Sequence, residues 1–154
     1  MIDQELLTDA FTLYLSGSAE KLNDREIKFN DGLIEITVEF PTNKPTYAIV
    51  RVYYKNGIKF EETTYQDGII HGYWMTWYKG GRRRSRVEYK NGMQHGCYIG
   101  WYESGFKKWE RTYIDGKICG HNTNWADGGR VMSESEYENG IWIRDIIPLG
   151  GKKC

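Results

Sequence analysis

The chain has 154 residues, enough for one domain and too few for two of ordinary size. Its 21 basic and 21 acidic side chains cancel, so net charge does not direct the protein to nucleic acid or to a membrane. No apolar run approaches the roughly 18 residues of a membrane-spanning helix, and three cysteines without a secretory leader pattern predict a soluble, cytoplasmic protein.

The first 52 residues are predicted to form an N-terminal cap. Apolar residues between Leu6 and Tyr14 recur at spacings of three and four, which predicts one amphipathic helix over residues 3–16. The alternating runs on either side of Asn30-Asp31-Gly32 predict a hairpin, which resembles a worn copy of the pattern that follows. A further strand is predicted over residues 46–54.

Residues 53–142 contain one pattern written almost four times. Five series of aromatic residues and glycines share a single step of 24 residues. They are Tyr53, Trp77, Trp101 and Trp125; Gly57, Gly81, Gly105 and Gly129; Tyr65, Tyr89, Tyr113 and Tyr137; Gly68, Gly92, Gly116 and Gly140; and Gly72, Gly96 and Gly120. A fixed period of this length indicates a repeat architecture built from stacked units.

Each unit contains two turn signals and therefore two strands. One signal is an Asp-Gly or Asn-Gly pair, such as Asp67-Gly68, which suits a two-residue hairpin turn. The other is a short segment such as Lys79-Gly80-Gly81. The sequence therefore predicts a mainly β protein, an extended antiparallel meander of about ten strands. Its repeat sheet is expected over residues 53–154, with a degraded last unit because Arg144 stands where the glycine series would continue.

The register of this sheet follows from the turns. If Gln66 pairs with Ile69 and the units stack without slippage, Trp77 lies opposite Arg82. The resulting row is Ile58, Trp77, Arg82, Trp101, Phe106, Trp125 and Arg130. It predicts a ladder of aromatic rings with guanidinium groups on indole faces. On the opposite face Tyr65 is expected beside Gly72. A bulge would shift these rows by one residue.

The repeated segments resemble a known family. Tyr65-Gln-Asp-Gly-Ile-Ile-His-Gly-Tyr-Trp74 and Tyr89-Lys-Asn-Gly-Met-Gln-His-Gly-Cys-Tyr98 look like MORN repeats. The step of 24 residues and the Trp-Tyr-x-x-Gly spacer look like the bacterial variant, over residues 53–142. The resemblance implies elongated antiparallel sheets. It also implies an antitoxin-like partner of a toxin system, or a scaffold or phospholipid-head-group binder as in other members.

One group of side chains is a candidate metal site. His71, Glu88 and His95 fall in one row of the predicted sheet, and two imidazoles beside a carboxylate are ligands that zinc accepts. The competing and favoured interpretation is that each histidine belongs to the repeat signature and hydrogen-bonds a neighbour. Cys97 and Cys119 occupy different repeat positions without a Cys-x-x-Cys motif, so we interpret them as structural. We find no catalytic set and expect neither an enzyme nor a cofactor.

The second repeat is basic and is the candidate partner-binding site. Residues 77–100 carry six basic side chains and one acidic one. The candidate contact residues are Arg82, Arg84, Arg86, Trp77, Trp101, Tyr98 and Tyr102. The three arginines alternate along one strand and are expected on one face, near aromatic rings. Nucleic acid is disfavoured because the cluster is isolated in a neutral chain, and a solvated strand face is the alternative.

These observations favour a non-enzymatic module that binds another protein, and the basic second repeat is compatible with a partner that has an acidic surface. Within that class we expect neutralisation of the partner, as by an antitoxin or immunity factor or by a viral inhibitor of a host defence enzyme. The alternatives are a peripheral binder of phospholipid head groups or a scaffold, and, least favoured, a metal-dependent enzyme. The strand predicted at Ile141–Ile147 would form an edge through which a second copy could pair.

Overall fold

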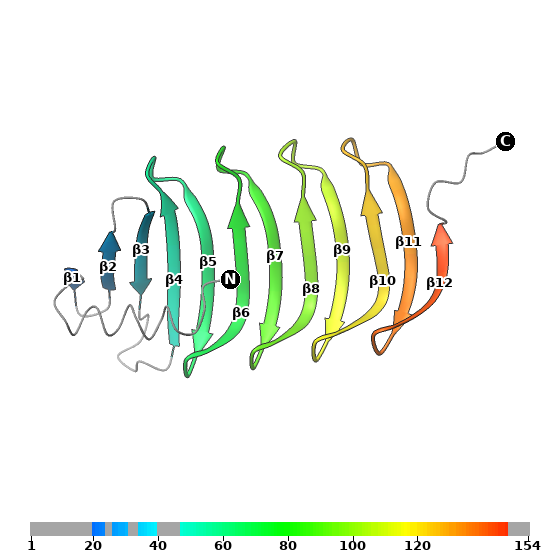
Figure 1. Ribbon diagram of the computed structural model, residues 1–154, viewed down its shortest axis with the longest axis horizontal. Helices are drawn as coiled ribbons and strands as arrows, with labels where there is room; N and C mark the ends of the chain where they lie inside the picture. Colours follow the sequence, from blue (N-terminus) through cyan, green and yellow to red (C-terminus); the bar gives the residue numbers. More distant parts are fainter. Residues whose placement is uncertain (1–19, 24–25, 31–33, 40–46, 148–154) are drawn as a thin grey trace.

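The computed structural model describes residues 20–23, 26–30, 34–39 and 47–147. Within these residues the chain forms one twelve-stranded antiparallel sheet, in which each strand pairs with its neighbours in sequence (Figure 1). In chain order the strands are β1 (Glu20–Asn23), β2 (Glu26–Asn30), β3 (Ile34–Glu39), β4 (Tyr47–Tyr54), β5 (Lys59–Gln66), β6 (Ile69–Trp77), β7 (Arg83–Lys90), β8 (Met93–Trp101), β9 (Lys107–Ile114), β10 (Lys117–Trp125), β11 (Val131–Glu138) and β12 (Ile141–Ile147).

The predicted β meander is confirmed, with twelve strands rather than about ten. The hairpin partners predicted around residues 30–32 are β2 and β3, whereas β1 had no clear signal in the sequence. The helix predicted over residues 3–16 lies outside the described residues. Over the part of the chain that is described, no helix is long and apolar enough to cross a membrane.

The Asp-Gly and Asn-Gly turns form as predicted. Asp67 and Gly68 have φ angles of 51° and 75°, and Asn91 and Gly92 have 51° and 81°. Two successive positive φ angles are the signature of the type I′ turn, whose twist matches that of the flanking strands. The same turn recurs at residues 115–116 and 139–140. One local sequence feature therefore closes one hairpin in each of the four repeats.

The second kind of turn also repeats. In the second repeat the Gly81 N–H donates to Tyr78 O and the Tyr78 N–H donates to Arg82 O, both at 2.8 Å. With Gly81 at a φ of 81°, this is a β-turn followed by a glycine bulge. The equivalent bonds occur at residues 54–58, 102–106 and 126–130. The tyrosine at this turn also joins consecutive repeats, because the Tyr78 hydroxyl donates to Trp101 O at 2.7 Å.

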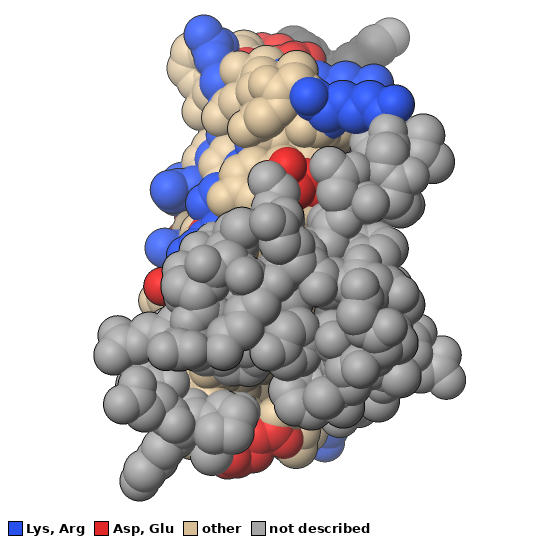
Figure 2. All heavy atoms as spheres, turned by 90° about the vertical axis from the view of Figure 1, so that its left-hand side faces the viewer, with Lys and Arg blue, Asp and Glu red and all other residues tan. Residues whose placement is uncertain are grey.

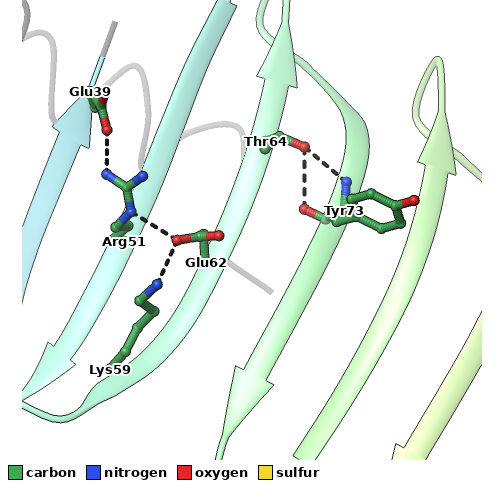
Figure 3. Close-up of polar contacts among 6 residues, drawn as sticks. All are labelled: Glu39, Arg51, Lys59, Glu62, Thr64 and Tyr73. Atoms are coloured by element: carbon green, nitrogen blue, oxygen red, sulfur yellow. Dashed lines mark hydrogen bonds and ion pairs between the residues drawn. The ribbon is translucent and has the colours of Figure 1, made fainter. Parts of the chain in front are cut away.

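A bulge near the Asp-Gly or Asn-Gly turn interrupts the hairpin of each of the four repeats. In the first repeat Tyr65 is opposite Ile70, but Thr63 is opposite Trp74, so β6 carries two extra residues there. The Thr64 hydroxyl bridges the gap. It accepts from the Tyr73 N–H at 2.9 Å (Figure 3). It also donates to the backbone carbonyl of His71. A side chain thus replaces the backbone ladder at this point.

Because of this bulge, the predicted position of the glycine series that begins with Gly72 is wrong. Gly72, at a φ of 88°, lies opposite Tyr89 of the next strand and not beside Tyr65. A Cβ atom at Gly72 would lie 2.6 Å from Thr64 Oγ1. Glycine is therefore required twice over, by its backbone conformation and by the hydroxyl that fills the space above it.

A second bulge lies at the opposite end of the strands. Thr76 is opposite Ser85 but Trp77 is opposite Arg83, which leaves Arg84 as the extra residue of β7. The predicted pairing of Trp77 with Arg82 is therefore wrong by one residue. The same shift occurs between Val52 and Tyr53, between residues 100 and 101, and between residues 124 and 125.

The two faces of the sheet have different chemistry. The core face contains Val50 and Val52, which are buried, and Val87, the least exposed side chain of the second repeat. Each such valine contributes roughly 1.5–3 kcal/mol to folding by burial. Along one row of this face the residues change from apolar to polar. The row runs Val38, Val50, Thr63, Trp74, Val87, Tyr98, Arg111, Asn122 and Ser135.

The other face is here called the charged face. In one of its rows, charged and uncharged side chains alternate from Glu62 onward. This row runs Thr37, Arg51, Glu62, Met75, Arg86, Ile99, Glu110, Thr123 and Glu134. Since neighbours in such a row have Cβ atoms about 5 Å apart, each side chain is in reach of the next. Figure 2, which looks along the sheet from its β1 end, shows lysine and arginine side chains projecting down the left-hand side of the view.

Candidate partner-binding face

A ladder of cations on indole rings crosses three repeats. Lys59 Nζ lies 4.8 Å from the centre of the Trp77 ring, and Arg83 Cζ lies 5.8 Å from that of Trp101. Lys107 Nζ lies 5.6 Å from the centre of the Trp125 ring. The predicted aromatic ladder therefore exists. The predicted row had Ile58, Arg82 and Phe106 at these places; the observed cations are the next residues, Lys59, Arg83 and Lys107, because the second bulge shifts the register.

In the first and third repeats the ladder cation has a partner on its own strand. Lys59 Nζ donates to Glu62 Oε2 at 2.7 Å, and Lys107 Nζ donates to Glu110 Oε2 at 2.5 Å. Residues three apart on a regular strand point to opposite faces. The bulge between them brings cation and carboxylate to the same face, so these ion pairs depend on the bulge.

The first repeat extends this pair into a network (Figure 3). Arg51 donates through Nε to Glu62 at 2.8 Å and through a terminal nitrogen to Glu39 at 2.5 Å. Burial works to raise the pKa of Glu62, but hydrogen bonds from Lys59 and Arg51 outweigh it, so this pKa lies below its ordinary value. Burial works to lower the pKa of Arg51, and its hydrogen bonds to Glu39 and Glu62 raise it above the ordinary value.

The second repeat breaks the pattern. Arg86 stands where Glu62 and Glu110 stand in the neighbouring repeats, so Arg83 has a second cation in place of a carboxylate. In the described part of the chain, no carboxylate forms an ion pair with either arginine. Among the described residues, positive charge is therefore concentrated here on the charged face without a paired carboxylate.

The Arg86 side chain is held by its surroundings. It lies between Met75 on β6 and Ile99 on β8, and its Cζ is 5.3 Å from the centre of the Tyr73 ring. Its Nε atom is buried and has no hydrogen-bond partner. A buried, unpaired guanidinium N–H is costly, because it has left water without gaining an acceptor.

The structure divides the other predicted site residues among several places. Arg82 belongs to the turn and donates to the carbonyls of Glu103 and Ser104, at 2.9 and 3.0 Å. Arg84 is the bulge residue, and its Cζ lies 5.9 Å from the centre of the Tyr78 ring. The expectation that Arg82, Arg84 and Arg86 share one face is therefore wrong, because turn and bulge interrupt the alternation.

The predicted tyrosines do not join Arg86 either. Tyr98 pairs with Val87 and lies on the core face, with its ring 5.9 Å from that of Trp109. The Tyr102 hydroxyl donates to Trp125 O at 2.8 Å and joins the third repeat to the fourth. Trp77 and Trp101 remain beside the arginine pair as ladder rings. The sequence did not predict Arg83 as a site residue. Only the bulge directs its side chain toward Trp101, and the alternation of side chains along a strand does not reveal a bulge.

The metal-site hypothesis is not supported by the geometry. His71 Nδ1 accepts from the Asn91 N–H at 3.4 Å, and His95 Nδ1 lies 3.1 Å from Asp115 Oδ1. Glu88 lies opposite Tyr73. Among the residues described, no three histidine, cysteine, aspartate or glutamate side chains gather as metal ligands would.

Comparisons with protein-family models, curated proteins and solved structures found no match to this chain. The resemblance to MORN repeats stays a prediction from the sequence, and the candidate site is argued from its own geometry.

Proposed function

We propose that this chain is a non-enzymatic binding module that docks another protein on its charged face and neutralises or inhibits it. The observation that carries the proposal is the pair Arg83 and Arg86, held among aromatic rings and without a described carboxylate. An antitoxin, an immunity factor and a viral inhibitor of a host enzyme all work by such docking. The MORN resemblance favours the first of these.

The chemistry around the arginines suits a protein partner. Arginine, tryptophan and tyrosine dominate the binding energy of protein interfaces, and Trp101 and Tyr73 lie beside the two guanidinium groups. Met75 adds apolar surface beside Arg86. We expect a partner with an acidic patch next to apolar side chains, because charge steers the encounter and apolar contact slows dissociation.

Capture from the native host tests the proposal. The wild-type protein is immobilised beside Arg86→Glu and beside Arg84→Glu, which makes the same change of charge at the bulge. We expect one protein that wild type and Arg84→Glu retain and Arg86→Glu loses. The activity of that protein is then measured with and without this chain. Retention that is equal on all three surfaces, or an activity that does not fall, contradicts the proposal.

Binding to phospholipid head groups is the competing function, since phosphate also attracts guanidinium groups. Sedimentation with neutral and with anionic liposomes separates the two. A protein-binding module stays in the supernatant with both kinds of liposome. Sedimentation with anionic liposomes that Arg86→Glu abolishes would favour the lipid function instead.

A further inference from the structure

We infer that Arg83 and Arg86 form a binding site for one carboxylate side chain of a partner protein. The inference rests on the proposed function, because the partner supplies the carboxylate. It names the chemical group that is recognised and the two residues that recognise it.

The neighbouring repeats show which group belongs at this place. At the two positions that Arg83 and Arg86 occupy, the first repeat has Lys59 and Glu62 in contact at 2.7 Å. The third repeat has the same lysine–glutamate arrangement at 2.5 Å. The backbone there is equivalent, since all three repeats have the same bulge in the same register. In both neighbouring repeats, the side chain at the position of Arg86 is thus a carboxylate that pairs with the cation on the indole ring.

In the second repeat that counter-ion must come from outside the repeat. Two guanidinium groups replace one ammonium and one carboxylate, and like charges at neighbouring positions repel. A single carboxylate between them would remove the repulsion.

The surroundings strengthen such a contact. Ile99 is only 9% exposed, and Met75 flanks Arg86 on the other side, so water is partly excluded. Guanidinium–carboxylate bonds are charge-assisted, and they gain strength where the local dielectric is low. The planar guanidinium can also bind a carboxylate through two parallel N–H bonds, which a lysine ammonium cannot.

Nuclear magnetic resonance titration tests the site without any partner. Nε–Hε signals of the arginines are followed while succinate is added to the folded protein, with inorganic phosphate as the second probe. We expect saturable shifts of the Arg83 and Arg86 signals with succinate and no saturable shift of Arg84. Phosphate should bind about tenfold more weakly or not at all, a difference of about 1.4 kcal/mol.

Two variants complete the test. Arg86→Glu restores the arrangement of the neighbouring repeats, so it should fold, and the Arg83 signal should no longer respond to succinate. Arg86→Gln removes the charge without adding a carboxylate and should weaken binding at least tenfold. The absence of saturable shifts in the wild-type protein, or tighter binding of phosphate than of succinate, overturns the carboxylate site. A positive titration with no captured partner would overturn the proposed function alone.

Discussion

The first and second repeats have the same backbone and different chemistry. In the first, Glu62 accepts from Lys59 and from Arg51, and every charge of the group has a partner. In the second, Arg86 takes the place of the glutamate, and Arg83 has no described carboxylate beside it. One residue at one repeat position changes a structural ion pair into a concentration of positive charge.

This difference shows how a repeat protein can separate stability from binding. The repeats that close their own ion pairs stabilise the sheet, and the repeat that leaves its cations open provides contact energy for a partner. Because each repeat contacts only its neighbours, the open repeat is supported on both sides.

The largest effect is expected when the first repeat is given the chemistry of the second. Glu62→Arg leaves Arg51, Lys59 and the new arginine without their shared carboxylate, at a cost of about 3 kcal/mol in the free energy of unfolding. Urea unfolding measures it. The matched change Glu110→Arg should cost about 1 kcal/mol, because that ion pair is more exposed. Equal losses in the two variants would contradict the role of the partly buried network around Glu62.

Acidity should weaken the first repeat through the same glutamate. The folded-state pKa of Glu62 is below its unfolded value, so its contribution is complete above the unfolded pKa of about 4.3. The contribution is lost as the pH falls through the lower, folded-state pKa. Glu62→Gln should therefore cost about 2 kcal/mol near neutral pH and progressively less below about pH 4. Urea unfolding as a function of pH measures this, with Glu138→Gln, an exposed residue of the last hairpin, as the control.

A smaller effect of opposite sign is expected when the second repeat is given the chemistry of the first. Arg86→Glu should stabilise the fold by roughly 0.5–1 kcal/mol, since Arg83 then gains a carboxylate in the geometry of its neighbours. Thermal and urea unfolding measure the change. Arg84→Glu is the control and should bring no such gain. A destabilised Arg86→Glu protein would mean that the two arginines already have a counter-ion.

The smallest effect is expected at the bulge. Arg84→Ala should change the free energy of unfolding by less than about 0.5 kcal/mol, because it removes only one exposed cation–aromatic contact. Retention of the captured partner should not change either. Loss of the partner in this variant would move the binding site from the charged face to the turn end of the strands.

Much of the fold follows from local chemistry that the sequence displays. Positive φ angles at Asp67 and Gly68 come from residues that tolerate them, so the hairpin turns were predicted at the residues where they form. The step of 24 residues then implied stacked hairpins and a ladder of rings, and Lys59 over Trp77 is one rung of that ladder. These features depend on residues close together in the chain.

The tertiary structure decided which side chains meet on each face. A side chain from one strand, Thr64, completes the bulge of the next, and the pairing of Trp77 with Arg83 depends on an extra residue across the hairpin. Such bulges form between strands and leave no mark in the period of either strand. Because side chains alternate, a shift of one residue reverses the face, and this is why Arg83 rather than Arg82 lies on the Trp101 ring.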